Sequence, residues 1–216
     1  DKISISGGEP FLNFPLLLDT VKYIRRTCGP RVEIEVFTNG TLARPADIRR
    51  VLPYTGKIVM SLDGRKESND LNRVFKNGGH SVFDAVLKNL SGLSRGELGK
   101  VCASMTVTAA TASCLSENVR FLREMGLGEV QINLNLLEYW NGKDLARLRN
   151  SVKKLKVYYG ALARSELKSF DGFRFGLEYI LLKWDETLKE TGVFKEISIA
   201  PDGRFYPCGL VSTYGP

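Results

Sequence analysis

A short apolar stretch at residues 2–5 leads directly into two glycines, a carboxylate and a proline. Isoleucines separated by small serines are typical of a buried parallel strand. Gly7 and Gly8 allow positive φ and let a ligand approach the backbone without a Cβ in the way. Pro10 favours an extended backbone at Glu9. The loop is therefore either a ligand site at the carboxyl end of a strand or an ordinary strand-to-helix turn.

Other predicted strands end in similar residues. We expect strands beginning at residues 2, 31, 57, 101 and 129, with predicted helices between them at 11–26, 45–52, 81–93 and 113–125. Further helices are predicted at 143–169 and 173–190, and a polar loop at 65–80. Strands that alternate with helices indicate an α/β fold with parallel strands. The strand ends then meet at one rim, which collects residues 7–10, Thr38-Asn39-Gly40, Ser61-Leu62-Asp63-Gly64, 106–109 and 133–135.

The composition is that of one globular α/β domain, with 216 residues, 43% hydrophobic and 25% charged. No apolar run has the length of a membrane span, and no signal peptide is recognisable. The net charge of +7 permits an anionic partner. No nucleic-acid partner is expected, because no recognition motif accompanies the basic residues. The basic cluster on the helix at 143–169 is predicted to be a solvated face; it comprises Arg147, Arg149, Lys153, Lys154 and Lys156.

The four cysteines lie far apart in the sequence and do not have metal-site spacing. They do not suggest a disulfide scaffold, so a reducing compartment, the cytoplasm, is expected. Cys28, Cys102 and Cys114 are each interpreted as small buried hydrophobes. The one histidine, His80, is interpreted as a turn residue, with a catalytic role as the alternative.

Three segments, in this order, resemble the radical S-adenosylmethionine enzymes: Ser6-Gly7-Gly8-Glu9-Pro10, Phe37-Thr38-Asn39-Gly40-Thr41 and Met60-Ser61-Leu62-Asp63-Gly64. Residues 69–73 and 79–84 are similar to the subgroup with a C-terminal SPASM or twitch extension. The tail at 197–208, with its Asp202-Gly203 hairpin signal, resembles the start of that extension. The resemblance implies a partial (β/α)6 TIM-like barrel that lacks its first strand, over residues 1–190. Residues 191–216 would begin the extension.

The resemblance also implies roles for individual residues. Gly7, Gly8, Glu9 and Pro10 would bind the amino group of S-adenosylmethionine, since a carboxylate suits an ammonium. Ser61 and Arg73 would contact its carboxylate or ribose. Thr38, Asn39 and Asp63 would line the same site. The alternatives are that Asn39 is present because it tolerates positive φ, that Asp63 more simply shapes its turn, and that Arg73 is a surface residue.

The implied chemistry is reductive cleavage of S-adenosylmethionine by a 4Fe-4S cluster, which generates a 5′-deoxyadenosyl radical. The electron donor would be a flavodoxin or ferredoxin. The substrate would be a peptide or protein, as for a maturase, and the basic surface would suit an acidic peptide. A small-molecule or RNA substrate is the alternative, and a non-catalytic domain that binds a nucleotide or a partner is another.

Two departures from the family pattern qualify this interpretation. The Cys-x-x-x-Cys-x-x-Cys loop that holds the cluster would precede Asp1, so we expect the chain to be a piece of a longer protein and inactive alone. Cys208 is either one ligand of an auxiliary cluster or a buried thiol.

Overall fold

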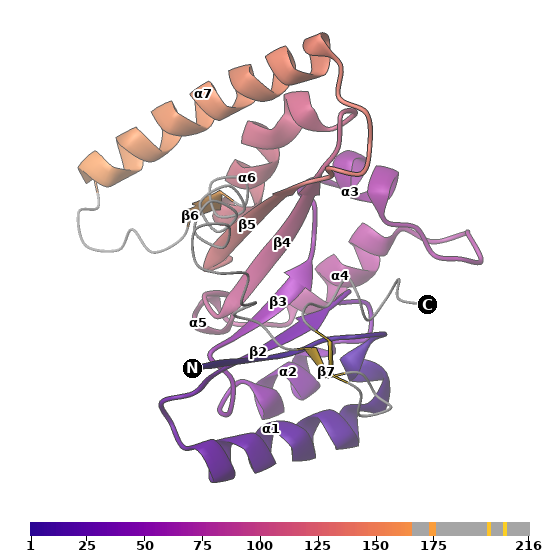
Figure 1. Ribbon diagram of the computed structural model, residues 1–216, viewed down its shortest axis with the longest axis vertical. Coiled ribbons are helices and arrows are strands. Elements are labelled where there is room, and N and C mark those ends of the chain that lie inside the picture. Colours follow the sequence, from indigo (N-terminus) through magenta and orange to yellow (C-terminus); the bar gives the residue numbers. More distant parts are fainter. Residues whose placement is uncertain (166–172, 176–197, 200–204, 207–216) are drawn as a thin grey trace. The chain divides into compact units, whose positions relative to one another are not determined.

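The computed structural model describes residues 1–165, 173–175, 198–199 and 205–206 (Figure 1). The chain divides into two units, residues 1–175 and 176–216. The first unit contains one parallel sheet, with strands in the order β1-β2-β3-β4-β5-β6. These strands are β1 (Lys2–Ile5), β2 (Glu33–Thr38), β3 (Lys57–Ser61), β4 (Val101–Val107), β5 (Glu129–Leu134) and β6 (Phe173–Phe175).

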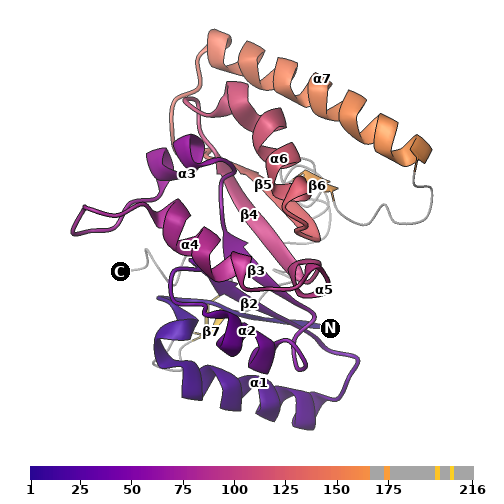
Figure 2. The ribbon, with the colours of Figure 1, turned by 180° about the vertical axis from the view of Figure 1, so that it is seen from behind.

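Helices connect successive strands and cover one face of the sheet, which is the near face in Figure 2. The α-helices are α1 (Phe14–Cys28), α2 (Pro45–Val51), α3 (Lys66–Asn72), α4 (Val82–Ser91), α5 (Arg95–Leu98), α6 (Leu115–Glu124) and α7 (Gly142–Ser165). Two 3-10 turns, η1 (Pro10–Asn13) and η2 (Ala112–Cys114), precede α1 and α6. The predicted α/β fold with parallel strands is confirmed, in the arrangement of a partial (β/α) barrel.

The hydrophobic core lies between the sheet and these helices. Every second strand residue points into it, because side chains alternate along a strand. Ile34 and Val36 of β2 are fully buried there, together with Ile58 and Met60 of β3. The helices contribute apolar stripes that include Val21, Ile48, Val86, Val119 and Leu155. The core therefore holds each strand in a fixed register, and with it the residues at the strand ends.

The opposite face of the sheet carries polar and charged side chains at the amino ends of its strands. Glu35 is fully buried, and its carboxylate lies 2.5 Å from Lys2 Nζ and 3.0 Å from Lys57 Nζ. Lys57 also pairs with Glu129 at 2.9 Å. Burial lowers the pKa of Lys57, but Glu129 and Glu35 outweigh that effect, so the pKa is raised. These ion pairs stabilise the end of the barrel away from the predicted site.

Two sequence predictions of secondary structure are wrong. The predicted loop at 65–80 contains α3, and the predicted helix at 173–190 begins with strand β6 instead. The rest of that segment lies outside the described residues. Helix α5 was not predicted; its four residues are held by a capping box between Ser94 and Glu97.

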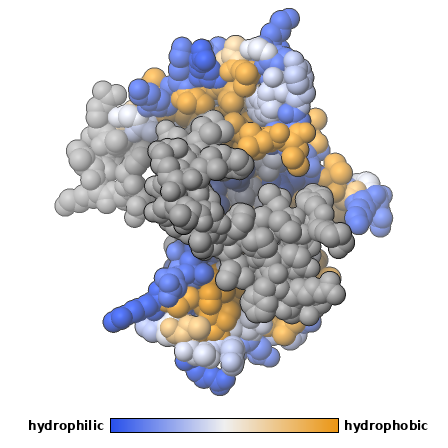
Figure 3. All heavy atoms as spheres, viewed as in Figure 1, coloured by the Kyte–Doolittle hydropathy of each residue, from blue (hydrophilic) through white to orange (hydrophobic). Residues whose placement is uncertain are grey.

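The predicted start of α4 is confirmed. The Ser81 hydroxyl accepts a hydrogen bond from the backbone N–H of Asp84 at 3.0 Å. The solvated face of α7 is also confirmed, because the five basic residues of the predicted cluster are exposed. Figure 3 shows hydrophilic side chains at the upper margin, where α7 lies. In the part of the chain that the structure describes, no helix is long and apolar enough to cross a membrane.

In the second unit, β7 (Ser198–Ile199) pairs antiparallel with β8 (Phe205–Tyr206). Two antiparallel strands on either side of Asp202-Gly203 agree with the hairpin signal in the sequence. The boundary predicted at residue 190 and the SPASM-like identity of this tail stay predictions. Cys208 lies outside the described residues.

Candidate functional site

The carboxyl ends of the parallel strands meet at one edge of the sheet, which we call the rim. After β1 the chain passes through Gly7 and Gly8, with φ of 98° and 50°. Both glycines are exposed, and a Cβ added to either would find no atom within 4 Å. The loop therefore presents bare backbone to open space. Such a cradle fits a ligand that hydrogen-bonds the main chain.

Glu9 fixes this loop to the next strand. Its backbone is extended, as Pro10 predicts, and its Oε1 accepts hydrogen bonds from Phe11 N at 3.1 Å and Thr38 Oγ1 at 2.6 Å. Its Oε2 accepts from Asn39 N at 2.7 Å. A carboxylate bound by three donors is well satisfied. Glu9 therefore links the ends of β1 and β2.

The end of β2 turns sharply at Thr38-Asn39-Gly40. Asn39 Oδ1 accepts hydrogen bonds from Thr41 N at 2.9 Å and Thr41 Oγ1 at 2.7 Å, which forms an Asx turn. Gly40 takes the positive φ, of 79°. The side chain of Asn39 thus shapes the turn, and its exposed position leaves it at the rim.

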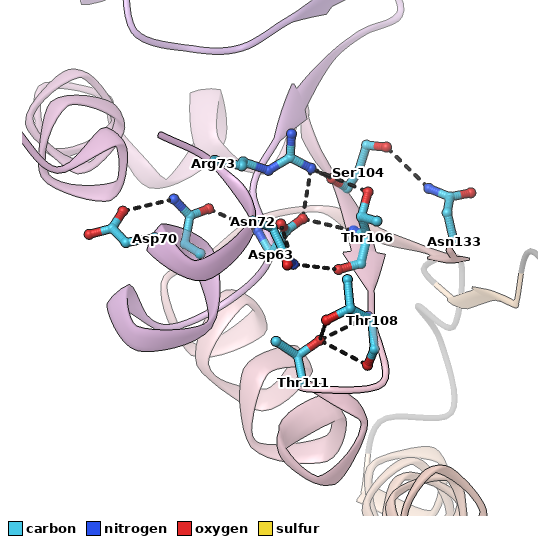
Figure 4. A network of polar contacts seen from close by, with 10 residues as sticks. Asp63, Asp70, Asn72, Arg73, Ser104, Thr106, Thr108, Thr111 and Asn133 are labelled. Atoms are coloured by element: carbon cyan, nitrogen blue, oxygen red, sulfur yellow. Dashed lines mark hydrogen bonds and ion pairs between the residues drawn. The ribbon is translucent and has the colours of Figure 1, made fainter. Parts of the chain in front are cut away.

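A second carboxylate links β3 to β4 (Figure 4). Asp63 is 1% exposed, and its Oδ1 accepts from Arg73 Nη2 and from Thr106 N, both at 2.7 Å. Its Oδ2 accepts from Asn72 Nδ2 at 3.2 Å. Asp63 and Glu9 therefore play the same structural part, because each joins one strand end to the backbone of the next.

Helix α3, which was not expected from the sequence, positions these groups. Asn69 is fully buried and accepts from the backbone N–H of Asp63 at 3.1 Å. Asp70 accepts from Ser81 Oγ at 2.5 Å and Phe83 N at 3.1 Å. Burial raises the pKa of Asp70, but these hydrogen bonds outweigh it, so the pKa is lowered. The polar run at 69–73 thus attaches α3 to β3, β4 and α4.

Other predicted site residues lie at or near the rim. Ser61 is half-buried at the last position of β3, in register with Ser104 of β4. Ser104 Oγ in turn accepts from Asn133 Nδ2 at 3.2 Å, a pair that the sequence did not single out (Figure 4). His80 is exposed in the turn between α3 and α4, beside an open hollow of about 610 Å³ lined by Phe75 and Lys76.

Large apolar side chains are exposed in helices and loops that follow several of the strands. They lie in the segments that follow β1, β2, β3 and β5. Side chains of this kind are more often buried in a core. The residues are Leu12, Leu16, Leu42, Leu71, Val74, Leu136, Leu137 and Tyr139, and Leu137 is 92% exposed. The segments that leave the rim thus carry exposed apolar side chains, which suit a partner that carries apolar groups.

The cysteines differ from the prediction. Cys102 is buried as expected, whereas Cys28 and Cys114 are exposed, because they stand at helix ends whose apolar faces turn elsewhere. Across the described residues, no three His, Cys, Asp or Glu side chains converge to hold a metal ion. This part of the chain therefore does not fit a 4Fe-4S cluster, which needs thiolate ligands.

Alkaline pH should destabilise the fold through Cys102. Burial raises the pKa of its thiol from 9.0 to about 12, and the charge of Glu129 adds to this. The folded pKa exceeds the unfolded one, so the stabilisation is complete below pH 9.0 and is lost as the pH rises towards 12. The free energy of unfolding should fall by up to about 1.4 kcal/mol per pH unit through this group. Urea titrations of Cys102→Ala should show a shallower decline above pH 9, and Cys28→Ala, at an exposed thiol, should match the wild type.

The chain is similar to a family model and to a protein of known sequence. A family model described as a 4Fe-4S single cluster domain matches residues 1–81. The uncharacterized protein MJ0907 of Methanocaldococcus jannaschii is 30% identical over 165 residues, which cover 73% of this chain and 57% of that protein.

Two solved structures are similar to the chain. One is anSMEcpe with bound AdoMet, with a TM-score of 0.68 and 20% identity over 96% of this chain and 60% of that one. The other is Streptococcus suis SuiB bound to the precursor peptide SuiA, with a TM-score of 0.66 and 15% identity over 100% of this chain and 50% of that one. The similarity shows a shared fold. The chain spans 50–60% of the length of these relatives.

Proposed function

We propose that this chain is the core of a radical S-adenosylmethionine enzyme, and that its rim binds S-adenosylmethionine. The observation that carries the proposal is the open Gly7-Gly8 backbone, held by Glu9 against the end of β2. The fold shared with anSMEcpe, whose structure contains AdoMet, and the matching 4Fe-4S family model support it.

We assign each predicted rim residue a role in binding the ligand. The backbone of Gly7 and Gly8 and the remaining lone pairs of Glu9 bind the amino group of the ligand, and Pro10 keeps Glu9 extended. Thr38 and Asn39 hold the neighbouring turn, and thus the loop that contacts the ligand. Ser61 and Arg73 bind the ligand carboxylate; the Arg73 side chain is 23% exposed at the rim, and a guanidinium suits a carboxylate.

Together with a reduced 4Fe-4S cluster, S-adenosylmethionine would supply radical chemistry to the site, and Gly7, Gly8 and Glu9 would hold it there. We place the cluster ligands outside the described residues, in a longer polypeptide, with a flavodoxin or ferredoxin as electron donor. Cys208 as an auxiliary ligand, and a location in the cytoplasm, stay predictions. This chain's own part is to bind and orient the cofactor.

We further propose that the substrate is a peptide or protein. The apolar side chains exposed in the segments that leave the rim support this, because they offer contacts to the side chains of a polypeptide. The precursor peptide bound to SuiB, a protein of the same fold, also supports it. A small-molecule or RNA substrate would leave these apolar groups in water.

The full-length gene product, purified without oxygen, tests the proposed reaction. With dithionite and S-adenosylmethionine it should contain iron and release 5′-deoxyadenosine. If the protein contains the cluster but releases no 5′-deoxyadenosine, the enzymatic proposal is contradicted. The chain would then be better explained as a binding domain.

Arg73→Ala should weaken S-adenosylmethionine binding by about tenfold or more, because a charge-assisted hydrogen bond to the ligand is lost. Isothermal titration of the ligand measures this, at a temperature where both proteins are folded. Arg120→Ala is the control, since that guanidinium is exposed on α6, where it lies 3.9 Å from Glu124 and over the ring of Tyr158 at 5.3 Å. Equal affinities for Arg73→Ala and the control would remove Arg73 from the site.

A further inference from the structure

The Asp63 carboxylate is enclosed by protein donors. It is 1% exposed and accepts hydrogen bonds from Arg73, Thr106 and Asn72, as described above. Little of its surface is left for a ligand. Its contacts with Arg73 instead suggest an indirect role in the site.

Arg73 is held on one side of its guanidinium. Nη2 lies 2.7 Å from Asp63 Oδ1, 3.4 Å from the carbonyl oxygen of Ser104 and 3.5 Å from Thr106 Oγ1. In Figure 4 the other terminal nitrogen points away from these contacts. The Arg73 side chain is 23% exposed, whereas the Asp63 side chain is 1% exposed.

Of the three acceptors on Nη2, only Asp63 is charged and close. The other two lie near the limit of hydrogen-bond distance and are neutral, so they hold the guanidinium weakly. An arginine side chain has many rotamers, and a ligand that must order them binds less tightly. Fixing Arg73 in advance therefore favours binding.

We infer that Asp63 is a positioning residue for the cofactor site: it holds Arg73 so that the guanidinium meets the ligand carboxylate already ordered. The inference rests on the proposed function. It gives Asp63 a role through Arg73, beyond the shaping of its turn that the sequence favoured. The link from Asp63 to Thr106 N also fixes this pair to the end of β4.

A double-mutant cycle tests the coupling, with S-adenosylmethionine as the titrated ligand. Asp63→Asn should weaken binding by about threefold to tenfold, and Arg73→Ala by about tenfold or more. In the Arg73→Ala background, Asp63→Asn should have little further effect. Independent effects that multiply would overturn the inference, because Asp63 would then act without Arg73. Should Asp63→Asn be too unstable, Asp63→Ser replaces it, since the short hydroxyl side chain removes the charge without adding bulk.

A measurement without ligand separates this inference from the proposed function. In nitrogen-15 NMR spectra, the guanidinium of Arg73, identified by its absence in Arg73→Ala, should show restricted rotation and slow hydrogen exchange in the wild type. In Asp63→Asn, the rotation of the Arg73 guanidinium and its hydrogen exchange should both become fast. Asp70→Asn is the control, because Asp70 caps α4 and has no contact with Arg73 among its hydrogen bonds. If Arg73 stays restricted in Asp63→Asn, the inference fails even if S-adenosylmethionine binds. If the wild type does not bind S-adenosylmethionine, the proposed function fails, and with it the cofactor role inferred for Asp63.

Discussion

Gly8→Val is expected to abolish S-adenosylmethionine binding while the chain remains folded. Gly8 has φ of 50° and faces open space, so the valine side chain would project into the region where the ligand approaches the backbone. A β-branched residue in this left-handed conformation also strains the loop, by about 1–2 kcal/mol. We expect affinity to fall by about 100-fold or more, since several backbone hydrogen bonds are blocked together. Isothermal titration measures the affinity, and circular dichroism the fold.

Gly78→Val distinguishes two possible causes of lost binding in Gly8→Val, the blocked approach of the ligand and the strain in the backbone. Gly78 has a similar φ of 66°, is exposed, and would also carry a Cβ with no atom within 4 Å, but it lies in the turn between α3 and α4. Both variants should lose similar stability, and only Gly8→Val should lose binding. Binding that survives in Gly8→Val, or that both variants lose alike, would argue against the Gly7-Gly8 loop as the ligand site.

Gly64→Ala should destabilise the fold by about 2–5 kcal/mol, which combines left-handed strain with an overpacked contact. Gly64 has φ of 118°, and an added Cβ would lie 2.3 Å from Cβ and Cγ of Asn118. Asn118 is 2% exposed, and it binds the backbone N–H of Arg65 and the hydroxyl of Ser68. It cannot move without losing these hydrogen bonds. Urea unfolding measures the change.

Gly96→Ala is the matched control for Gly64. Its added Cβ would meet no atom within 4 Å, and it lies within helix α5. It should leave stability unchanged or raise it by about 0.5–1 kcal/mol, because alanine favours a helix. If Gly64→Ala were as stable as this control, the close packing between the β3 loop and α6 would be contradicted.

Much of the fold could be predicted from the sequence, because apolar stretches that end in glycine or polar residues are readily interpreted as buried strands followed by loops. Helix α3 could not, since its buried residues are polar. Ser68 and Asn69 are satisfied by hydrogen bonds to other elements, and in sequence they resemble a loop. Strand β6 has three residues, too few to show a pattern of alternation.

The geometry of the candidate site could be predicted in part. The open backbone of the glycines in residues 7–10 could be predicted, because the absence of a Cβ is a property of each residue by itself. The partners of Glu9 and Asp63 could not, since each carboxylate is bound by a backbone N–H from the neighbouring strand end. Those contacts depend on strand order and register. The sequence thus indicates which carboxylates lie at the rim, while the structure shows what holds them.

The central claim, that the rim binds S-adenosylmethionine, is tested most directly by amide NMR of the chain titrated with this ligand. The account predicts chemical-shift changes concentrated at Gly7, Gly8, Asn39 and Leu62, at the ends of β1, β2 and β3. The hollow at residues 75–80 should be unaffected. Changes centred on that hollow, or no changes at millimolar ligand, would contradict it.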